Sequence, residues 1–119
     1  MGDFRQLVAW QESRKLALLS RGAIAALPRS EQYALASQWR RAAYSVALNI
    51  AEGAGQVSRK QFVRYLNIAL GSLDELQGVL ELADAMGYLS GATLEELRKS
   101  RLHCVRLVAA LVRRLREPE

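Results

Sequence analysis

The sequence predicts an all-α protein that folds as an antiparallel up-down-up-down four-helix bundle, with residues 1–119 forming a single domain. Three observations support this prediction. Only two prolines occur, Pro28 and Pro118, so long stretches lack the residue that most often interrupts a helix. Apolar residues recur at helical spacing in four segments, and the connections between these segments are short. Helices joined in this way pack beside one another as an up-down bundle.

The first helix is expected from Phe4 to Ala26, with Pro28 ending it. Its apolar residues form one loose seam, at Leu16, Leu19, Ala23 and Leu27. The second helix is expected to begin at Ser30, a residue type that often caps helix N-termini, and to end at Gly53. The connection after Gly53 is short, which places the third helix antiparallel to the second.

The third helix has the clearest start signal, because Ser58 and Gln61 have the spacing of a capping box. An unbroken heptad seam follows, at Phe62, Leu66, Ala69, Leu73, Leu76, Leu80 and Ala83. A second seam lies beside it, at Tyr65, Ile68, Ser72, Glu75, Val79, Leu82 and Met86. The helix is expected to end at Gly87. A second capping box, Thr93 with Glu96, predicts the start of a fourth helix.

The composition is that of a globular domain, with 50% hydrophobic and 24% charged residues among 119. The net charge of +5 permits an acidic partner without requiring one. We expect a cytoplasmic protein because its single cysteine, Cys104, has no partner for an internal disulfide. No apolar run approaches the roughly 20 residues of a membrane span, and the N-terminus has no apolar signal segment.

The second helix has apolar residues on two faces. One face is a core stripe of Leu35, Trp39, Ala42, Ala43, Val46 and Ile50. The opposite face carries Tyr44, Ala47, Leu48 and Ala51. A helix that is apolar on two sides is normally buried on two sides. We therefore expect a homo-oligomer with Tyr44, Leu48 and Ala51 at the interface.

A polar seam runs between these two faces, at Gln38, Arg41, Ser45, Asn49 and Glu52. In an antiparallel hairpin that turns after Gly53, Arg41 lies level with Ser72 and Glu75. We expect these residues together to form a buried polar network centred on an Arg41–Glu75 pair, because buried charges need partners. A carboxylate catalyst at Glu52 or Glu75 is the functional alternative, but it lacks a second nearby acid or a nucleophile.

The sequence points to no reaction. His103 is the only histidine, so a catalytic triad or a multi-histidine metal site is not expected within one chain. His103 and Cys104 point about 100° apart on a helix, so they do not converge on one metal. We expect a solvent-facing histidine beside a core cysteine, with no metal, no cofactor and no catalytic residue, in a protein that is not an enzyme.

Charge is unevenly distributed along the third and fourth helices. In an up-down bundle the start of the third and the end of the fourth lie together, which gathers Arg59, Lys60, Arg64, Arg113, Arg114 and Arg116 at a basic end. The opposite, acidic end carries Glu81, Asp84, Glu95 and Glu96. The helix dipole disfavours cations at a helix start, so Arg59 and Lys60 favour an anionic partner, RNA or DNA, at the basic end.

The run Gln38…Arg40-Arg41-Ala42…Ser45…Asn49-Ile50-Ala51-Glu52-Gly53 resembles the signature of the 23S rRNA intervening-sequence proteins, also called the S23 family. Further matches include Leu27-Pro28, Phe62…Tyr65-Leu66, Gly71-Ser72-Leu73-Asp74-Glu75-Leu76 and Gly87-Tyr88-Leu89. The resemblance implies a four-helix bundle that assembles as a homopentamer. It also implies kinship with the accessory proteins of diversity-generating retroelements, which bind nucleic acid and a reverse transcriptase.

From these observations we expect a non-enzymatic homo-oligomer, pentameric by the resemblance, that binds nucleic acid or a nucleoprotein such as a reverse transcriptase through its basic end. The alternative is a structural scaffold that holds another protein and does not bind nucleic acid. No membrane partner is expected in either case.

Overall fold

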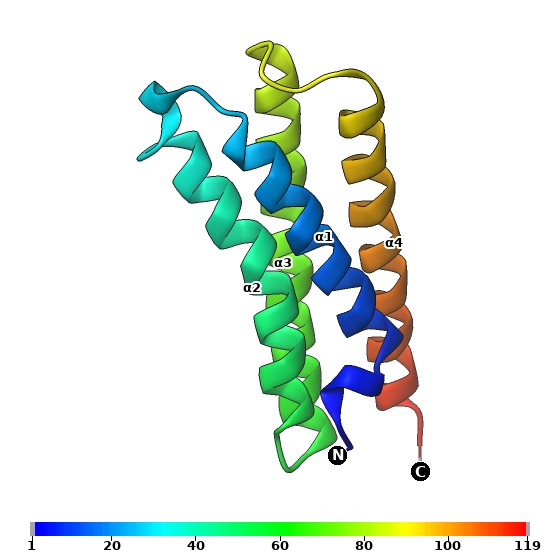
Figure 1. Cartoon of the computed structure of the whole chain (residues 1–119). Coiled ribbons are helices and arrows are strands. Elements are labelled where there is room, and N and C mark those ends of the chain that lie inside the picture. Colours follow the sequence, from blue (N-terminus) through cyan, green and yellow to red (C-terminus); the bar gives the residue numbers. More distant parts are fainter. Residues whose placement is uncertain (1, 119) are drawn as a thin grey trace.

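The computed structural model describes residues 2–118, and no strand occurs in this part of the chain. The elements are, in chain order, η1 (Phe4–Gln6), α1 (Val8–Ala25), η2 (Arg29–Glu31), α2 (Leu35–Ala54), α3 (Arg59–Ala85) and α4 (Gly91–Arg116). The four α-helices alternate in direction along a bundle of 49 × 24 × 20 Å (Figure 1). The predicted up-down four-helix bundle is confirmed.

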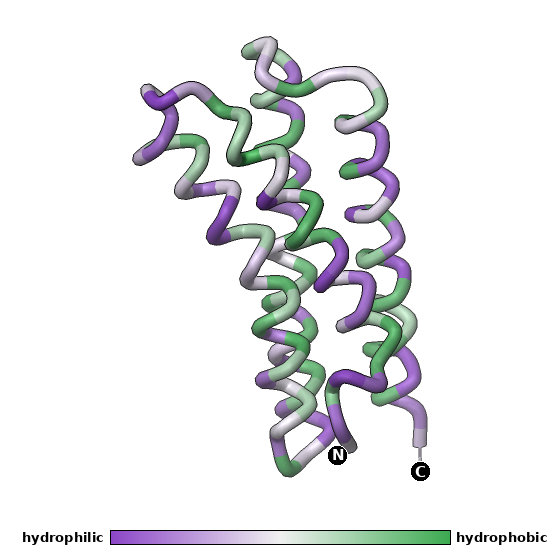
Figure 2. The backbone as a smooth tube through the Cα atoms, viewed as in Figure 1, coloured by the Kyte–Doolittle hydropathy of each residue, from purple (hydrophilic) through white to green (hydrophobic). Residues whose placement is uncertain are grey.

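Each α-helix packs on two others. α1 and α3 each contact both α2 and α4, so α2 and α4 occupy diagonally opposite corners of the bundle. The two ends of the chain and the α2–α3 turn lie at one end of the bundle, and η2 and the α3–α4 loop lie at the other (Figure 1). Apolar and polar residues alternate along the helices, as expected for amphipathic elements with one side toward the core (Figure 2).

The core follows the predicted heptad seam of α3 and the core stripe of α2. Every residue of that seam is buried, and the α2 stripe includes Trp39, which is fully inaccessible. The predicted seam of α1 is wrong in part, because Leu19, Ala23 and Leu27 are only half-buried. The buried face of α1 is Ala9, Ser13, Leu16, Ser20 and Ile24. The Ser13 hydroxyl is satisfied locally, because its Oγ donates to the Trp10 carbonyl at 2.7 Å. The Ser20 hydroxyl is equally buried and has no hydrogen-bond partner among residues 2–118.

The expected first helix is divided at Leu7, whose backbone is extended (φ −75°, ψ 127°). Before it, the Asp3 carboxylate accepts a hydrogen bond from the Arg5 amide at 2.9 Å and closes the short η1 turn. η1 therefore folds back on α1, and the rings of Phe4 and Trp10 meet edge to face at 5.0 Å. An apolar pattern does not distinguish this arrangement from a continuous helix.

The second helix does not begin at Ser30. Residues 29–31 form η2, and α2 starts only at Leu35, without a side-chain cap. Tertiary structure holds this segment, because the Tyr88 hydroxyl, from the α3–α4 loop, donates to the Glu31 carboxylate at 2.9 Å. This hydrogen bond raises the pKa of Tyr88 above its ordinary value.

The ends of α3 agree with the sequence, whereas the start of α4 does not. Ser58 Oγ accepts from the Gln61 amide at 3.1 Å, and Gly87 follows the helix with φ +78°. The Tyr88 amide bonds the Ala83 carbonyl and the Gly87 amide bonds the Asp84 carbonyl, which is a Schellman motif. α4 begins at Gly91, whose φ of +60° suits glycine, so the predicted cap Thr93 lies inside the first turn.

Gly53 packs tightly against α3 just before the turn. A Cβ at this position would lie 2.9 Å from Phe62 Cδ1 and 2.9 Å from Tyr65 Cβ. Neither atom is the free end of a flexible side chain. The absence of a side chain at Gly53 therefore allows α2 and α3 to pack this closely beside their turn.

We expect Gly53→Ala to lower the free energy of unfolding by about 1–3 kcal/mol, the usual cost of overpacking a close contact. Chemical denaturation followed by circular dichroism measures the change. Gly22→Ala is the matched control, because a Cβ on exposed Gly22 would meet no atom within 4 Å. It should stabilise the protein by up to about 1 kcal/mol through helix propensity. A stability loss at Gly22 as large as that at Gly53 would contradict the steric explanation.

Candidate functional site

The start of α3 and the end of α4 meet at the basic end, as the topology requires. Arg59 Nη1 donates to the Leu115 carbonyl at 3.5 Å and to the Glu117 carbonyl at 3.3 Å. The guanidinium thus satisfies carbonyls at the C-terminus of α4, where a cation is favoured. This contact explains why a cation is tolerated at the start of α3. Arg59 at the start of α3 is therefore explained by the fold and does not by itself indicate an anionic partner.

The other basic residues of this end have no such partner. Lys60, Arg64, Arg113, Arg114 and Arg116 are exposed, and no carboxylate in residues 2–118 lies within ion-pair distance of them. Lys60 borders two shallow hollows with Val63 at their floor, one shared with Arg116 and the other with Arg64. Arg114 borders a separate hollow between α4 and the start of α1. From here on, the basic end means these five residues.

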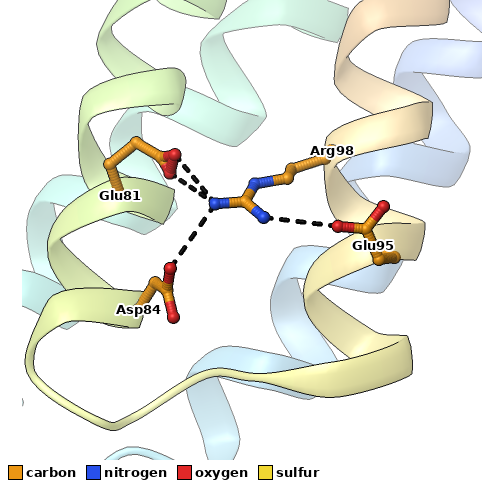
Figure 3. Close-up of polar contacts among 4 residues, drawn as sticks. All are labelled: Glu81, Asp84, Glu95 and Arg98. Carbon is orange, nitrogen blue, oxygen red and sulfur yellow. Dashed lines mark hydrogen bonds and ion pairs between the residues drawn. The ribbon is translucent and has the colours of Figure 1, made fainter.

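The acidic end contains its own counter-charge. Arg98 Nη2 donates to both oxygens of Glu81, at 2.8 and 2.7 Å, and to Asp84 at 3.5 Å. Arg98 Nη1 donates to Glu95 at 3.3 Å, so one guanidinium joins three carboxylates from α3 and α4 (Figure 3). The hydrogen bonds to Glu81 raise the pKa of Arg98 further. These acids lie at one end as predicted, and Arg98 is a partner that was not predicted, although its position three residues after Glu95 is a signal for such a pair.

The polar seam of α2 faces α3 at the edge of their interface. Ser45 Oγ and Ser72 Oγ are 2.8 Å apart, and Asn49 Nδ2 donates to the Ser45 carbonyl at 2.8 Å. Arg41 Nη2 donates to Gln38 Oε1 at 2.7 Å and to Glu75 Oε2 at 3.3 Å. The structure therefore brings together the residues that the hairpin register placed level. The prediction is wrong for Glu52, which is exposed and does not join these hydrogen bonds; its backbone carbonyl accepts from Gln56 Nε2, outside the network.

The expected burial of this network is wrong for the single chain. The side chains of Arg41 and Glu75 are 69% and 42% exposed, Gln38 is exposed, and Ser45, Asn49 and Ser72 are half-buried. The reason is that the polar seam lies at the edge of the α2–α3 interface and not at its centre. The short side chains stay between the helices, whereas the long charged ones extend past the helix edge into solvent.

The outer apolar face of α2 borders a groove with α1. Tyr44, Ala47 and Leu48 line it from α2, and Trp10, Ala17 and Leu18 line it from α1, with Arg14 at the rim. The groove encloses about 260 Å³, and Leu48 is 67% exposed. Ala51, the third predicted interface residue, is half-buried one turn further along α2. Contiguous exposed apolar side chains of this kind mark interaction surfaces.

Three apolar residues of the second seam of α3 are also exposed, Ile68, Leu82 and Met86, at 44%, 51% and 51%. Ser72, Glu75 and the buried Val79 separate Ile68 from the other two. Leu82 and Met86, near the end of α3, therefore form a small exposed apolar pair that is distinct from the α1–α2 groove.

Cys104 and His103 have the surroundings expected from the sequence. Cys104 is buried, and burial raises the pKa of its thiol to about 12. At neutral pH the thiol is protonated and does not act as a nucleophile. His103 is exposed, with Nδ1 3.5 Å from Glu12. Among residues 2–118, no three His, Cys, Asp or Glu side chains are arranged to hold a metal ion, and no helix is both long and apolar enough to cross a bilayer.

The chain matches the family model of the 23S rRNA-intervening sequence protein over residues 5–110. In three dimensions it is similar to a protein of unknown function from the S23 ribosomal protein family of Bacteroides thetaiotaomicron VPI-5482. The two chains are 24% identical and have a TM-score of 0.82, covering 88% of this chain and 98% of the other. At this identity the likeness supports the fold alone. No curated protein is detectably similar in sequence.

The exposure of the Arg41–Glu75 pair predicts a small contribution to stability. Glu75→Gln should lower the free energy of unfolding by less than about 1 kcal/mol, as is usual for exposed ion pairs. A buried pair would instead cost about 3–5 kcal/mol when one partner is removed. Thermal and urea unfolding of the variant distinguish an exposed pair from a buried one. A loss above about 2 kcal/mol would show that the pair is desolvated in solution.

Proposed function

The chain belongs to the 23S rRNA-intervening sequence protein family, and from this premise we propose that it is a non-enzymatic, cytoplasmic homo-oligomer that binds nucleic acid through its basic end. A nucleoprotein, such as a reverse transcriptase bound to nucleic acid, could bind in the same way, because it presents the same phosphate backbone. The observation that carries the proposal is the contrast between the two ends of the bundle. At the acidic end Arg98 bonds Glu81, Asp84 and Glu95, and the cluster keeps a net negative charge, whereas the five cations of the basic end have no carboxylate within ion-pair distance in residues 2–118.

The chemistry of the basic end favours phosphate contacts over base recognition. Its hollows have apolar floors and cationic rims, and no aromatic side chain lines the hollows that Lys60 borders. Phe62 is buried and Tyr65 is half-buried against Gly53, so neither offers a stacking surface there. Binding should therefore show little sequence preference and fall steeply with salt. The family name refers to 23S rRNA, which makes RNA the first nucleic acid to test.

The exposed apolar side chains support the oligomeric part of the proposal. A closed ring with one type of contact needs two different surfaces on each subunit, since the contact is head-to-tail. The α1–α2 groove supplies one candidate surface, and the exposed Leu82 and Met86 near the end of α3 supply the other. The number five rests on the family resemblance. In a cyclic ring every basic end would lie on the same face, so one strand could contact several ends and gain effective concentration.

A structural scaffold is the second candidate function. The α1–α2 groove favours it, because an apolar surface suits another protein as well as a second copy of this chain. The salt dependence of binding separates the two functions. Phosphate contacts release counterions when they form, and contacts between apolar surfaces do not.

We expect Lys60→Glu with Arg64→Glu to abolish RNA binding while leaving the fold intact. Lys60 lies in the first turn of α3, where a negative charge is favoured by the helix dipole, so the variant should not be destabilised. Fluorescence anisotropy with a labelled 30-nucleotide RNA in 50 mM KCl measures binding, and circular dichroism checks the fold. Arg21→Glu with Arg29→Glu is the matched control, because these exposed cations lie at the opposite end of the bundle. Equal binding by both double variants would contradict the proposal.

Leu48→Arg should produce a smaller assembly than the parent protein. The substitution places a charge on the most exposed apolar side chain of the α1–α2 groove, and an interface core does not accommodate an unpaired charge. Light scattering coupled to size-exclusion chromatography at micromolar concentration gives the mass. Tyr33→Arg is the control, because Tyr33 is 94% exposed and lies outside the groove. A monomeric mass for the parent protein would end the oligomer proposal.

A further inference from the structure

The solvent-facing side of α4 carries three basic residues at seven-residue spacing, Lys99, Arg106 and Arg113. Seven residues are nearly two turns of an α-helix, so the three side chains lie on one face, about 10.5 Å apart along the axis. All three are exposed. We refer to them as the α4 stripe.

No neighbouring carboxylate compensates the α4 stripe. Residues 97–116 contain no Asp or Glu, and in residues 2–118 no acid lies within ion-pair distance of the three cations. Two acids lie one turn before Lys99: Glu95 binds Arg98, and the exposed Glu96 does not come within ion-pair distance of Lys99. On the α1 side, Glu12 accepts from Ser100 and lies 4.0 Å from Lys15.

The helix dipole does not explain the stripe either. A cation is stabilised by the dipole only within the last turn of a helix. α4 ends at Arg116, so Arg113 is close enough to benefit, but Lys99 and Arg106 lie several turns earlier. An ordinary soluble surface intersperses both signs of charge. Lys99 and Arg106 are therefore charges without an internal structural role in the described chain.

The α4 stripe continues the basic end up the side of the bundle. Arg113 belongs to both, and the distance along α4 from Lys99 to Arg116 is about 26 Å at 1.5 Å per residue. A stacked strand rises about 3.4 Å per nucleotide, so this path corresponds to about eight nucleotides. α4 is diagonally opposite α2, and the stripe shares no residue with the α1–α2 groove or with the exposed apolar residues of α3.

We infer that a nucleic-acid strand held at the basic end continues along α4, with its phosphates contacting Lys99 and Arg106. This inference rests on the proposed function and extends it by stating where the strand runs on the protein, from the basic end along α4. The partner is identified by its chemistry, since a linear row of exposed cations matches a linear row of phosphates. The contacts are to the backbone, so they add affinity without adding sequence preference.

The test is the salt dependence of RNA binding by Lys99→Gln with Arg106→Gln. For a single strand, each lost phosphate contact reduces the slope of log Kobs against log[KCl] by about 0.7, so the double variant should have a slope shallower by about 1.4. The probe is the labelled 30-nucleotide RNA, titrated between 50 and 300 mM KCl. Arg21→Gln with Arg29→Gln removes the same charge at the far end and should leave the slope unchanged. Lys99→Arg with Arg106→Lys keeps both charges and should retain the parent slope.

The outcomes separate this inference from the proposed function. If the parent protein binds RNA and the stripe variant keeps the parent slope, the strand does not follow α4, although the basic end still binds it. If the stripe variant and the far-end control lose the same slope, only net charge matters and the inference is overturned. If the parent protein does not bind RNA but sediments with phosphatidylserine vesicles, both the inference and the proposed function are wrong. Gln is a good helix former, and circular dichroism should show unchanged helicity in every variant.

Discussion

Gly53 lies against Phe62 and Tyr65 of α3, and the missing side chain there allows α2 and α3 to pack closely beside their turn. Further along the same interface, the short side chains of Ser45 and Ser72 reach each other at 2.8 Å. The α2–α3 hairpin brings the start of α3 to the end of α4, where Arg59 bonds the Leu115 and Glu117 carbonyls. The basic end therefore depends on helix packing as well as on its own charges.

The two ends of the bundle use arginine in opposite ways. At the acidic end, Arg98 is enclosed by Glu81, Asp84 and Glu95 and links α3 to α4 beside their connecting loop (Figure 3). At the basic end, Arg59 binds backbone carbonyls, and the cations around it have no carboxylate partner in residues 2–118. A charge with an internal partner stabilises the fold, whereas a charge without one is available to a ligand. This difference, more than the net charge of +5, supports an anionic partner.

The polar seam of α2 separates two kinds of surface. On one side, the core stripe around Trp39 is inaccessible to solvent. On the other, Tyr44 and Leu48 border an open groove with α1. The exposed Arg41–Glu75 pair lies near this boundary and contributes little to the stability of the single chain.

The sequence by itself determined the four helices, their order and the buried seam from Phe62 to Ala83, because helical periodicity and the Ser58 cap are local properties of the chain. It also identified the family, through the run from Gln38 to Gly53. Only the tertiary structure decided where α2 and α4 begin, that Arg41 is exposed, and that Arg59 and Arg98 have internal partners. Those features depend on contacts between distant segments, such as the hydrogen bond from Tyr88 to Glu31. They also depend on whether a side chain lies at the centre or at the edge of a helix–helix interface. Periodicity specifies which face of a helix a residue occupies, but not which atoms of another helix lie opposite it.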